Sequence, residues 1–200
     1  MPNWCNNNLE LRHENPEMIE RAAIAFTQGR LLDEFIPIPE SLHIVAGRVS
    51  DSIEQEALEA QEKLNEVQHG YKNWYDFCTN EWGTKWDIGG EDYHINKMDS
   101  NSVNMGFDSA WAPPLAAYEK LKDQGFEVVA YYYEPGMSFA GIYDENGDDY
   151  YDLSGTAEWV RENIPKVLDE MFGISDDKAE YEDDENQEID LDGGVNAINE

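Results

Sequence analysis

The segment 126–134, FEVVAYYYE, consists almost entirely of β-branched and aromatic residues, and it restricts the fold more than any other stretch. Such side chains favour strands, because they pack well on a pleated, half-buried surface. A helical pattern precedes it over residues 112–125, with prolines near its start and Gly125 at its end, where helices commonly begin and stop. The chain must therefore contain a sheet on which this helix packs.

The patterns upstream place this helix and strand in a defined order. Within residues 4–13, WCNNNLELRH, Leu9 and Leu11 alternate with polar side chains, which predicts a strand. Asn15 and Pro16 then suit the start of a helix that stops at Gly29. Residues 93–107 predict a hairpin with a DSNS turn. The order strand, helix, strand, strand, helix, strand is that of the ferredoxin-like, split βαβ fold.

An insertion at about residues 40–90 interrupts this order after the first helix. Prolines two positions apart predict a short extended segment and a loop over 31–42, since proline cannot donate to a strand ladder. Residues 50–70 predict a helix on the surface of the domain, with a narrow apolar stripe. The aromatic segment that follows predicts a short helix ending near Gly83. The stripe consists of Ile53, Ala57, Ala60, Leu64 and Val67.

Two further elements follow the last ferredoxin-like strand. Residues 138–153 predict an appended hairpin around Asn146-Gly147, a dipeptide that favours a tight turn. Residues 156–173 predict a C-terminal helix that Pro165 kinks or divides. We therefore expect one α+β domain over residues 1–174, a ferredoxin-like sandwich with a helical and aromatic insertion.

The composition changes at Ser175. Residues 175–200 contain eleven acids, one lysine and few apolar residues. Low hydrophobicity with charge of one sign is typical of disordered segments. We expect this segment to form a disordered acidic tail.

The charge of the whole chain is extreme, with 44 acids against 13 bases and a formal net charge of −31. Binding to nucleic acids and anionic membranes depends on lysine and arginine, so both are disfavoured as direct partners. Basic proteins are favoured, although the charge can also serve only to keep the protein soluble. No apolar run reaches the roughly 18–20 residues of a membrane span, and the expected location is the cytoplasm.

No set of residues indicates catalysis. Cys5 and Cys78 are too few for a disulfide framework and too far apart for a zinc site, and they suit buried positions beside tryptophans. The acids around Gly147 lack the spacing of a calcium loop. We therefore expect no catalytic residue, no metal site and no cofactor.

The segment 80–87, NEWGTKWD, places two tryptophans around a lysine. Tryptophan rings can hold a cation, and with lysine they can grip a flat or anionic ligand. The same rings can also lock the insertion onto the sheet. The ligand interpretation predicts a pocket lined by Trp82, Lys85, Trp86, Trp111 and Glu134.

The tyrosines at 131–133 raise a similar choice. Sheets of this topology can bind RNA through exposed aromatic rings, helped by basic residues. Acids flank these tyrosines instead, at Glu127 and Glu134. We expect the rings to pack under the appended hairpin.

Five motifs are spread over about residues 2–143: MPNWCNN, FIPIPESL, WYDFCTNEWGTKWD, FDSAWAPP and YYYEPGMSFAG. In this order they resemble the YubB-type ferredoxin-like domain family of phage and plasmid proteins. The resemblance implies a ferredoxin-like fold and carriage on a mobile element. The family has no assigned activity, so it implies no catalytic residues.

These observations favour a non-enzymatic phage or plasmid accessory protein in the host cytoplasm. It would bind a basic host protein, with its carboxylates acting as an acidic mimic of DNA. The alternative is a small-ligand-binding or enzymatic domain that uses the tryptophan and lysine pocket. The expected partner-binding residues are Asp176, Asp177, Glu182, Asp183, Asp184 and Glu185.

Overall fold

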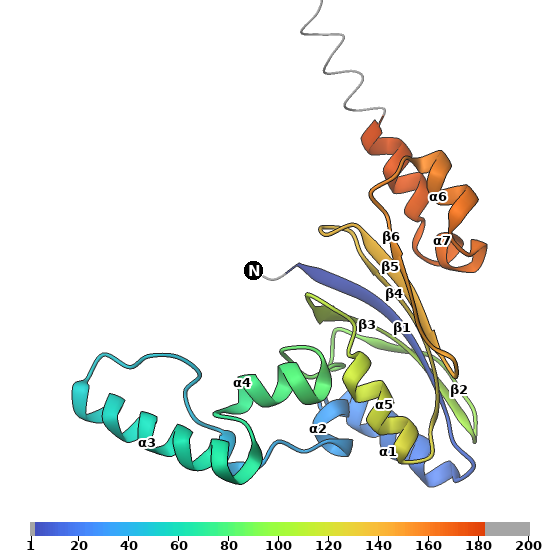
Figure 1. Cartoon of the computed structure of the whole chain (residues 1–200). Coiled ribbons are helices and arrows are strands. Elements are labelled where there is room, and N and C mark those ends of the chain that lie inside the picture. The colour runs from blue at the N-terminus through green and yellow to red at the C-terminus, as the bar shows by residue number, and fades with distance from the viewer. Residues whose placement is uncertain (1–2, 183–200) are drawn as a thin grey trace, which may run out of the picture.

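The computed structural model describes residues 3–182, in which six antiparallel strands form one sheet with the order β2-β3-β1-β4-β5-β6 (Figure 1). The first four of these neighbours, β2-β3-β1-β4, have the ferredoxin-like order. The predicted α+β class is confirmed. The strands are β1 (Trp4–Arg12), β2 (His94–Met98), β3 (Ser102–Ala110), β4 (Glu127–Glu134), β5 (Phe139–Asp144) and β6 (Gly147–Asp152).

One face of the sheet packs on α1 (Pro16–Thr27) and α5 (Leu115–Asp123) and forms the main core. Alternation decides which strand residues face these helices, because successive side chains point to opposite faces. Leu9 and Leu11 of β1 are fully buried, as is Phe26 of α1. The predicted first helix is confirmed, and the Asn15 side chain accepts a hydrogen bond from the backbone N–H of Glu17.

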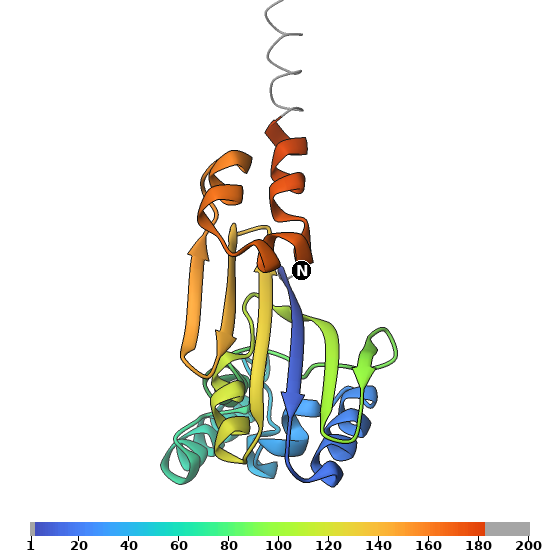
Figure 2. The same ribbon diagram turned by 90° about the vertical axis from the view of Figure 1, so that its right-hand side faces the viewer.

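The opposite face is covered at one end by α6 (Ala157–Asn163) and α7 (Lys166–Phe172), as Figure 2 shows. These helices bury Tyr133 of β4 and Ala140 of β5 in a second, smaller core. The predicted division at Pro165 is confirmed, because the preceding residue, Ile164, has extended backbone.

The hairpin β5–β6 extends the sheet beside β4. The expected packing of the tyrosine rings under the hairpin is wrong for Tyr131 and Tyr133, because these rings pack in the smaller core with α6 and α7. Tyr132 points to the other face of the sheet. Its ring lies against Gly141 of β5, and its hydroxyl donates to the carboxylate of Asp148 of β6 at 2.7 Å.

The insertion is largely helical. Leu31–Phe35 form the short helix α2, so the expected extended segment is wrong at this point. Its buried leucines face the main core, and that packing outweighs the prolines that follow. Residues Glu40–Leu42 form one 3-10 turn, and the aromatic segment forms α4 (Trp74–Phe77), continued by a π-helical turn over Cys78–Trp82.

The predicted helix at 50–70 is present as α3 (Ser52–His69), between Asp51 and Gly70 as caps. It lies outside α2 and α4, at the far side of the molecule from the sheet (Figure 1). Its five predicted apolar residues, which we call the α3 stripe, do not contribute to either core: Ile53, Ala57, Ala60, Leu64 and Val67.

The folded part of the chain extends beyond the expected boundary at residue 174. Residues 174–182 are helical, and Ile174 is fully buried in the smaller core. The first part of the expected acidic tail is therefore structured. Residues 183–200 lie outside the described part of the chain.

Candidate functional site

Three tryptophans converge at the end of the sheet where β1 begins and β3 ends. Trp4, Trp86 and Trp111 are 43%, 39% and 42% exposed, respectively. The Lys85 ammonium lies 4.5 Å from the ring centre of Trp86, 5.4 Å from that of Trp111 and 5.8 Å from that of Tyr75. We call these four rings and the lysine the aromatic cluster. Each ring can attract the cation through its negative face.

Backbone contacts between distant segments hold the aromatic cluster together. The N–H of Trp111 donates to the carbonyl oxygen of Asn3 at 2.9 Å, and Trp111 has a φ of 69°, which is unusual for a bulky residue. The Thr84 hydroxyl donates to the carbonyl oxygen of Ala110 at 3.2 Å. The ring centres of Trp4 and Trp86 lie 5.9 Å apart. The insertion thus contacts the start of β1 and the end of β3 here.

Trp82, predicted to line the ligand pocket, is a core residue instead. It is 2% exposed, and its indole N–H donates to the carbonyl oxygen of Ile36 at 3.0 Å. Gly83 directly after it has a φ of 82° and lies against the backbone of Leu115 and Ala116, where a side chain would meet main-chain atoms. The prediction of a ligand contact for Trp82 is wrong, because this turn is packed against α5.

Glu134 is also buried, and its carboxylate stabilises a turn. It accepts hydrogen bonds from the backbone N–H groups of Gly136 at 3.0 Å and Met137 at 2.5 Å. These bonds stabilise the turn between β4 and β5, and each uses one of the two carboxylate oxygens. Glu134 is therefore a turn-forming residue, and its predicted contact with a ligand is not supported by its position. Of the five predicted pocket residues, the structure brings together Lys85, Trp86 and Trp111.

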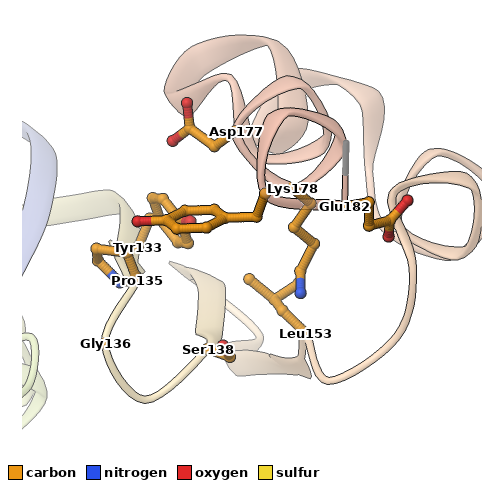
Figure 3. Close-up of a pocket in the computed structure, with 9 residues that line it drawn as sticks. Tyr133, Pro135, Gly136, Ser138, Leu153, Asp177, Lys178 and Glu182 are labelled. Carbon is orange, nitrogen blue, oxygen red and sulfur yellow. The ribbon is translucent and has the colours of Figure 1, made fainter. Parts of the chain in front are cut away.

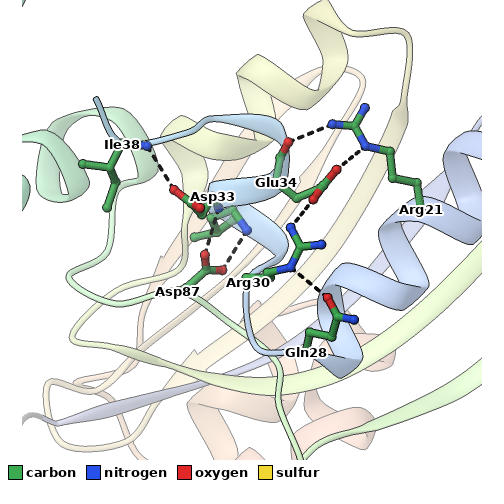
Figure 4. A network of polar contacts seen from close by, with 8 residues as sticks. Arg21, Gln28, Arg30, Asp33, Glu34, Ile38 and Asp87 are labelled. Carbon is green, nitrogen blue, oxygen red and sulfur yellow. Dashed lines mark hydrogen bonds and ion pairs between the residues drawn. The ribbon is translucent and has the colours of Figure 1, made fainter. Parts of the chain in front are cut away.

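Asp87, the last residue of the segment 80–87, connects the insertion to α2 through hydrogen bonds (Figure 4). Its two carboxylate oxygens accept the backbone N–H groups of Leu32 at 2.7 Å and Asp33 at 2.8 Å. Burial raises the pKa of the Asp87 carboxyl to about 6, although these backbone donors favour its ionised form. Sequence reasoning missed this role, because the bonded residues lie more than fifty positions upstream.

A second set of polar contacts in Figure 4 joins α1 to α2. The Glu34 carboxylate pairs with both Arg21 and Arg30, and Arg21 also donates to the carbonyl oxygen of Glu34 at 2.9 Å. Hydrogen bonds from the two guanidinium groups hold the pKa of Glu34 below its usual value. These contacts use two of the few basic residues to stabilise the fold, which leaves them unsuited to anion binding.

The two thiols lie in surroundings that suppress their reactivity. Burial raises the pKa of both Cys5 and Cys78 to about 12, so both remain protonated at neutral pH. A thiolate is the reactive form, and neither site supplies it. Within residues 3–182, no cluster of three or more histidine, cysteine, aspartate or glutamate side chains is arranged to hold a metal ion.

A groove lies between the β4–β5 turn and helix 174–182, with a volume of 480 Å³ (Figure 3). Tyr133 and Leu153 form part of its base, and Asp177 and Lys178 line it from the helix. The charged residues that line the groove are Asp177, Glu182 and Lys178, so charges of both signs are present. Its rim contains some of the residues predicted to bind a partner.

Those predicted partner-binding residues have different roles in the structure. Asp176 pairs with Arg161 at 3.2 Å, and Glu182 accepts the backbone N–H of Ala157 at 2.8 Å, which caps α6. Asp177 is exposed and lines the groove. Asp183, Asp184 and Glu185 lie outside the described residues. Only Asp177 among the described members of this set is free of a fold-stabilising contact that the structure shows.

Carboxylates greatly outnumber cations over the described surface. Residues 3–182 contain 37 acids and all 13 bases of the chain. Six of these bases form ion pairs with acids of the same chain: Arg12, Arg21, Arg30, Lys120, Arg161 and Lys166. Most acids in this part of the chain therefore have no base with which to pair.

The helices described over residues 3–182 include none with both the length and the apolar character of a membrane span.

Comparison with known proteins adds little about function. No family model matches the chain, and no curated protein matches it. Among solved structures, the chain is similar to protein api92 from Yersinia pseudotuberculosis, which belongs to the family DUF1281. The two share 14% sequence identity and a TM-score of 0.40, over 76% of this chain and 98% of that one.

Proposed function

We propose that this protein is a non-catalytic accessory protein of a phage or plasmid that binds a basic host protein in the cytoplasm. The observation that carries the proposal is the excess of carboxylates: 37 acids against 13 bases in the described residues, with six bases already paired in the fold. The origin on a mobile element rests on the five motifs shared with the YubB-type family.

The finer form of the proposal is mimicry of DNA. A surface with many unpaired carboxylates presents a dense negative charge, as the phosphate backbone does. Such a surface attracts basic grooves from a distance and speeds association. The partner would then be a protein whose own ligand is a nucleic acid, and salt would weaken the complex strongly.

A capture experiment from host lysate tests both levels of the proposal. The immobilised protein should retain basic proteins at low salt and fewer at moderate salt, and added duplex DNA should displace them. Retention that duplex DNA does not affect would support a basic partner and contradict mimicry. Recovery of no basic or DNA-binding protein at either salt concentration would contradict the whole proposal.

The aromatic cluster supports a second candidate function, the binding of a small flat or anionic ligand. The supporting observation is the position of Lys85 among the exposed rings of Trp86 and Trp111 and the partly buried ring of Tyr75. Tryptophan fluorescence during titration with a panel of nucleotides and aromatic acids tests this directly. Lys85→Ala should abolish any ligand-induced change while the melting temperature stays within a few degrees of the wild type.

The fold-stabilising interpretation of Lys85 gives the opposite result. In that case Lys85→Ala lowers the melting temperature by several degrees, and no ligand in the panel changes the fluorescence. Lys85→Arg is the matched control, since it keeps the positive charge and the stacking on aromatic faces.

A further inference from the structure

The α3 stripe is an apolar surface that the rest of the described chain leaves exposed. Ile53, Leu64 and Val67 are 77%, 56% and 87% exposed, respectively. Ala57 and Ala60 complete the stripe and are exposed too. These residues recur every three or four positions, so they share one side of the helix. A contiguous exposed apolar patch with a polar border is typical of an interaction site.

Another side of α3 is attached to the body of the protein. Asn65 is fully buried, and its side-chain amide donates to the carbonyl oxygens of Ser41 and Lys72, both at 2.9 Å. Gln61 donates to the Asn65 side-chain oxygen at 2.9 Å. These contacts fix how the helix is turned about its axis, and they direct the stripe towards solvent.

The helix is complete without a partner. The Asp51 carboxylate accepts the backbone N–H groups of Ile53 at 2.9 Å and Glu54 at 3.0 Å. Gly70 ends the helix with a φ of 82°, the left-handed conformation common at helix C-termini. A preformed helix loses little conformational freedom on binding, which favours association.

Acids border the stripe and determine which occupant fits. Glu56 and Glu59 line the open hollow beside Ala60, Leu64 and Val67, with Lys63 as its one basic residue. Helix α3 carries five glutamates, which are Glu54, Glu56, Glu59, Glu62 and Glu66.

A second copy of the chain is a poor occupant of this surface. Two α3 helices side by side would bring glutamates together, in molecules that each carry a net charge of −31. Like charges at a helix interface cost stability. An apolar ridge bordered by lysine or arginine would instead meet the stripe and its acids together, as flanking charges select partners in coiled coils.

We propose that α3 is a docking helix for a cationic amphipathic helix of a partner protein. The two helices would pack apolar stripe against apolar stripe, with basic residues of the partner beside Glu56 and Glu59. The proposal rests on the proposed function in one respect, the positive charge of the partner. It adds a place and a shape, because it assigns the contact to α3 and gives the partner a helix.

Titration of a labelled synthetic helix tests the proposal on the full-length protein. The probe has leucine at the a and d positions of its heptads and lysine at e and g, and a matched peptide carries glutamate at e and g. Fluorescence anisotropy should show saturable binding of the lysine peptide and little of the glutamate peptide. Equal binding of both peptides, or of neither, would overturn the proposal.

Variants then locate the binding site. The double change Leu64→Ser and Val67→Ser removes two of the three large apolar side chains of the stripe at exposed positions and should weaken binding at least about tenfold. Ile24→Ser is the matched control, because Ile24 is an exposed apolar residue of α1, and it should change the affinity less than about twofold. Circular dichroism confirms that α3 stays helical. Equal affinity in the stripe variant would contradict the proposal.

Charge reversal tests the acidic border separately. Glu56→Lys together with Glu59→Lys should weaken the lysine peptide and reduce the dependence of its affinity on salt. Unchanged affinity would show that these acids do not face the probe, which contradicts the proposed geometry. Light scattering is the remaining check: a dimer that the stripe variant dissociates would assign α3 to self-association and overturn the proposal.

The outcomes for α3 and for the proposed function can be separated. If the stripe variant loses the peptide but still captures basic host proteins that DNA displaces, the function stands and uses another surface. If it binds the peptide normally and still captures them, only the α3 proposal fails. If neither the wild type nor any variant captures a basic host protein while the wild type binds the peptide, the docking helix stands and the proposed function loses its support.

Discussion

Helices α1 and α3 have the same kind of sequence pattern and opposite fates. Both begin at an Asx cap, and both carry one apolar side. In α1 most of that side is buried, and Phe26 near its C-terminal end is fully buried, whereas in α3 Leu64 and Val67 face solvent. The pattern predicts a helix in both places. Whether the apolar side becomes core depends on where the helix lies, because α1 packs on the sheet and α3 belongs to an insertion outside that layer.

Truncating each stripe should give the largest contrast between the two helices. Phe26→Ala should lower the free energy of unfolding by about 3–5 kcal/mol, because it leaves a cavity in the main core. Leu64→Ala should change it by less than about 0.5 kcal/mol, since the side chain already faces water. Urea unfolding of the two variants measures both values. A large loss in Leu64→Ala would mean that the stripe is buried in solution.

Two glycines near the C-terminal ends of these helices give the next contrast: Gly70 ends α3, and Gly89 lies against the last turn of α1. Gly89 and Gly70 both have positive φ, at 97° and 82°, but a side-chain carbon at Gly89 would lie 2.0 Å from the carbonyl oxygen of Phe26. Around Gly70 no atom lies within 4 Å of that position. Gly89→Ala should therefore cost about 2–4 kcal/mol, from backbone strain and overpacking. Gly70→Ala should cost about 1 kcal/mol, from strain alone.

Thermal unfolding of both glycine variants provides the measurement. Equal losses would mean that the segment 88–90 does not press on the end of α1 as the structure has it. The comparison is matched, since both changes add the same methyl group at a residue with positive φ.

The pH dependence of Asp87 should produce a smaller effect, in a window between about pH 4 and 6. Its pKa is raised to about 6 in the folded state, so the folded protein binds a proton more readily than the unfolded chain. The stability that Asp87 contributes is therefore full below about pH 4 and falls as the pH rises through 6.

The neutral variant Asp87→Asn isolates this effect from the many other carboxylates. The stability of the wild type relative to Asp87→Asn should increase by on the order of 2 kcal/mol between pH 7 and pH 4. Chemical unfolding of both proteins across this range measures it. A difference that stays constant with pH would show that the carboxyl is not desolvated as its position between α2 and the 80–87 segment requires.

Lys85→Ala should have the smallest effect on stability. The ammonium group contacts three partly exposed rings, and such contacts contribute about 0.5–1 kcal/mol at exposed sites. The change should lower the melting temperature by only a few degrees. A loss of folding in this variant would place the aromatic cluster with the core, as in α1, and not with the exposed surfaces, as in α3.

Local patterns were sufficient to predict the sheet, its order and most helix ends. Period-two alternation, caps such as Asn15 and the break at Pro165 each act within a few residues, so the sequence alone reveals them. Helix α2 was missed because two later prolines dominate the local signal, whereas its leucines are held by the core. The helix at 174–182 was missed because its acids hide a short apolar side that contains Ile174.

The candidate site was harder to predict, because burial there depends on distant contacts. Trp82 and Trp86 have the same side chain and lie four residues apart, yet one is buried and the other is exposed. The difference arises because the turn at Gly83 packs against α5. The residues near Trp82 in the sequence do not predict this contact. Tyr75 approaches Lys85, and Trp4 packs on Trp86, only because the fold brings these distant segments together.

The capping of α6 by Glu182 has a practical consequence for experiments on the acidic C-terminal segment. Composition suggests cutting the chain at residue 174, but that cut would remove the acceptor for the N–H of Ala157 and the last residues that shield Tyr133. The cut would damage the fold of the shortened protein, and any resulting loss of partner binding would be mistaken for a role of the acids. Deletions that probe those acids should keep every residue up to 182.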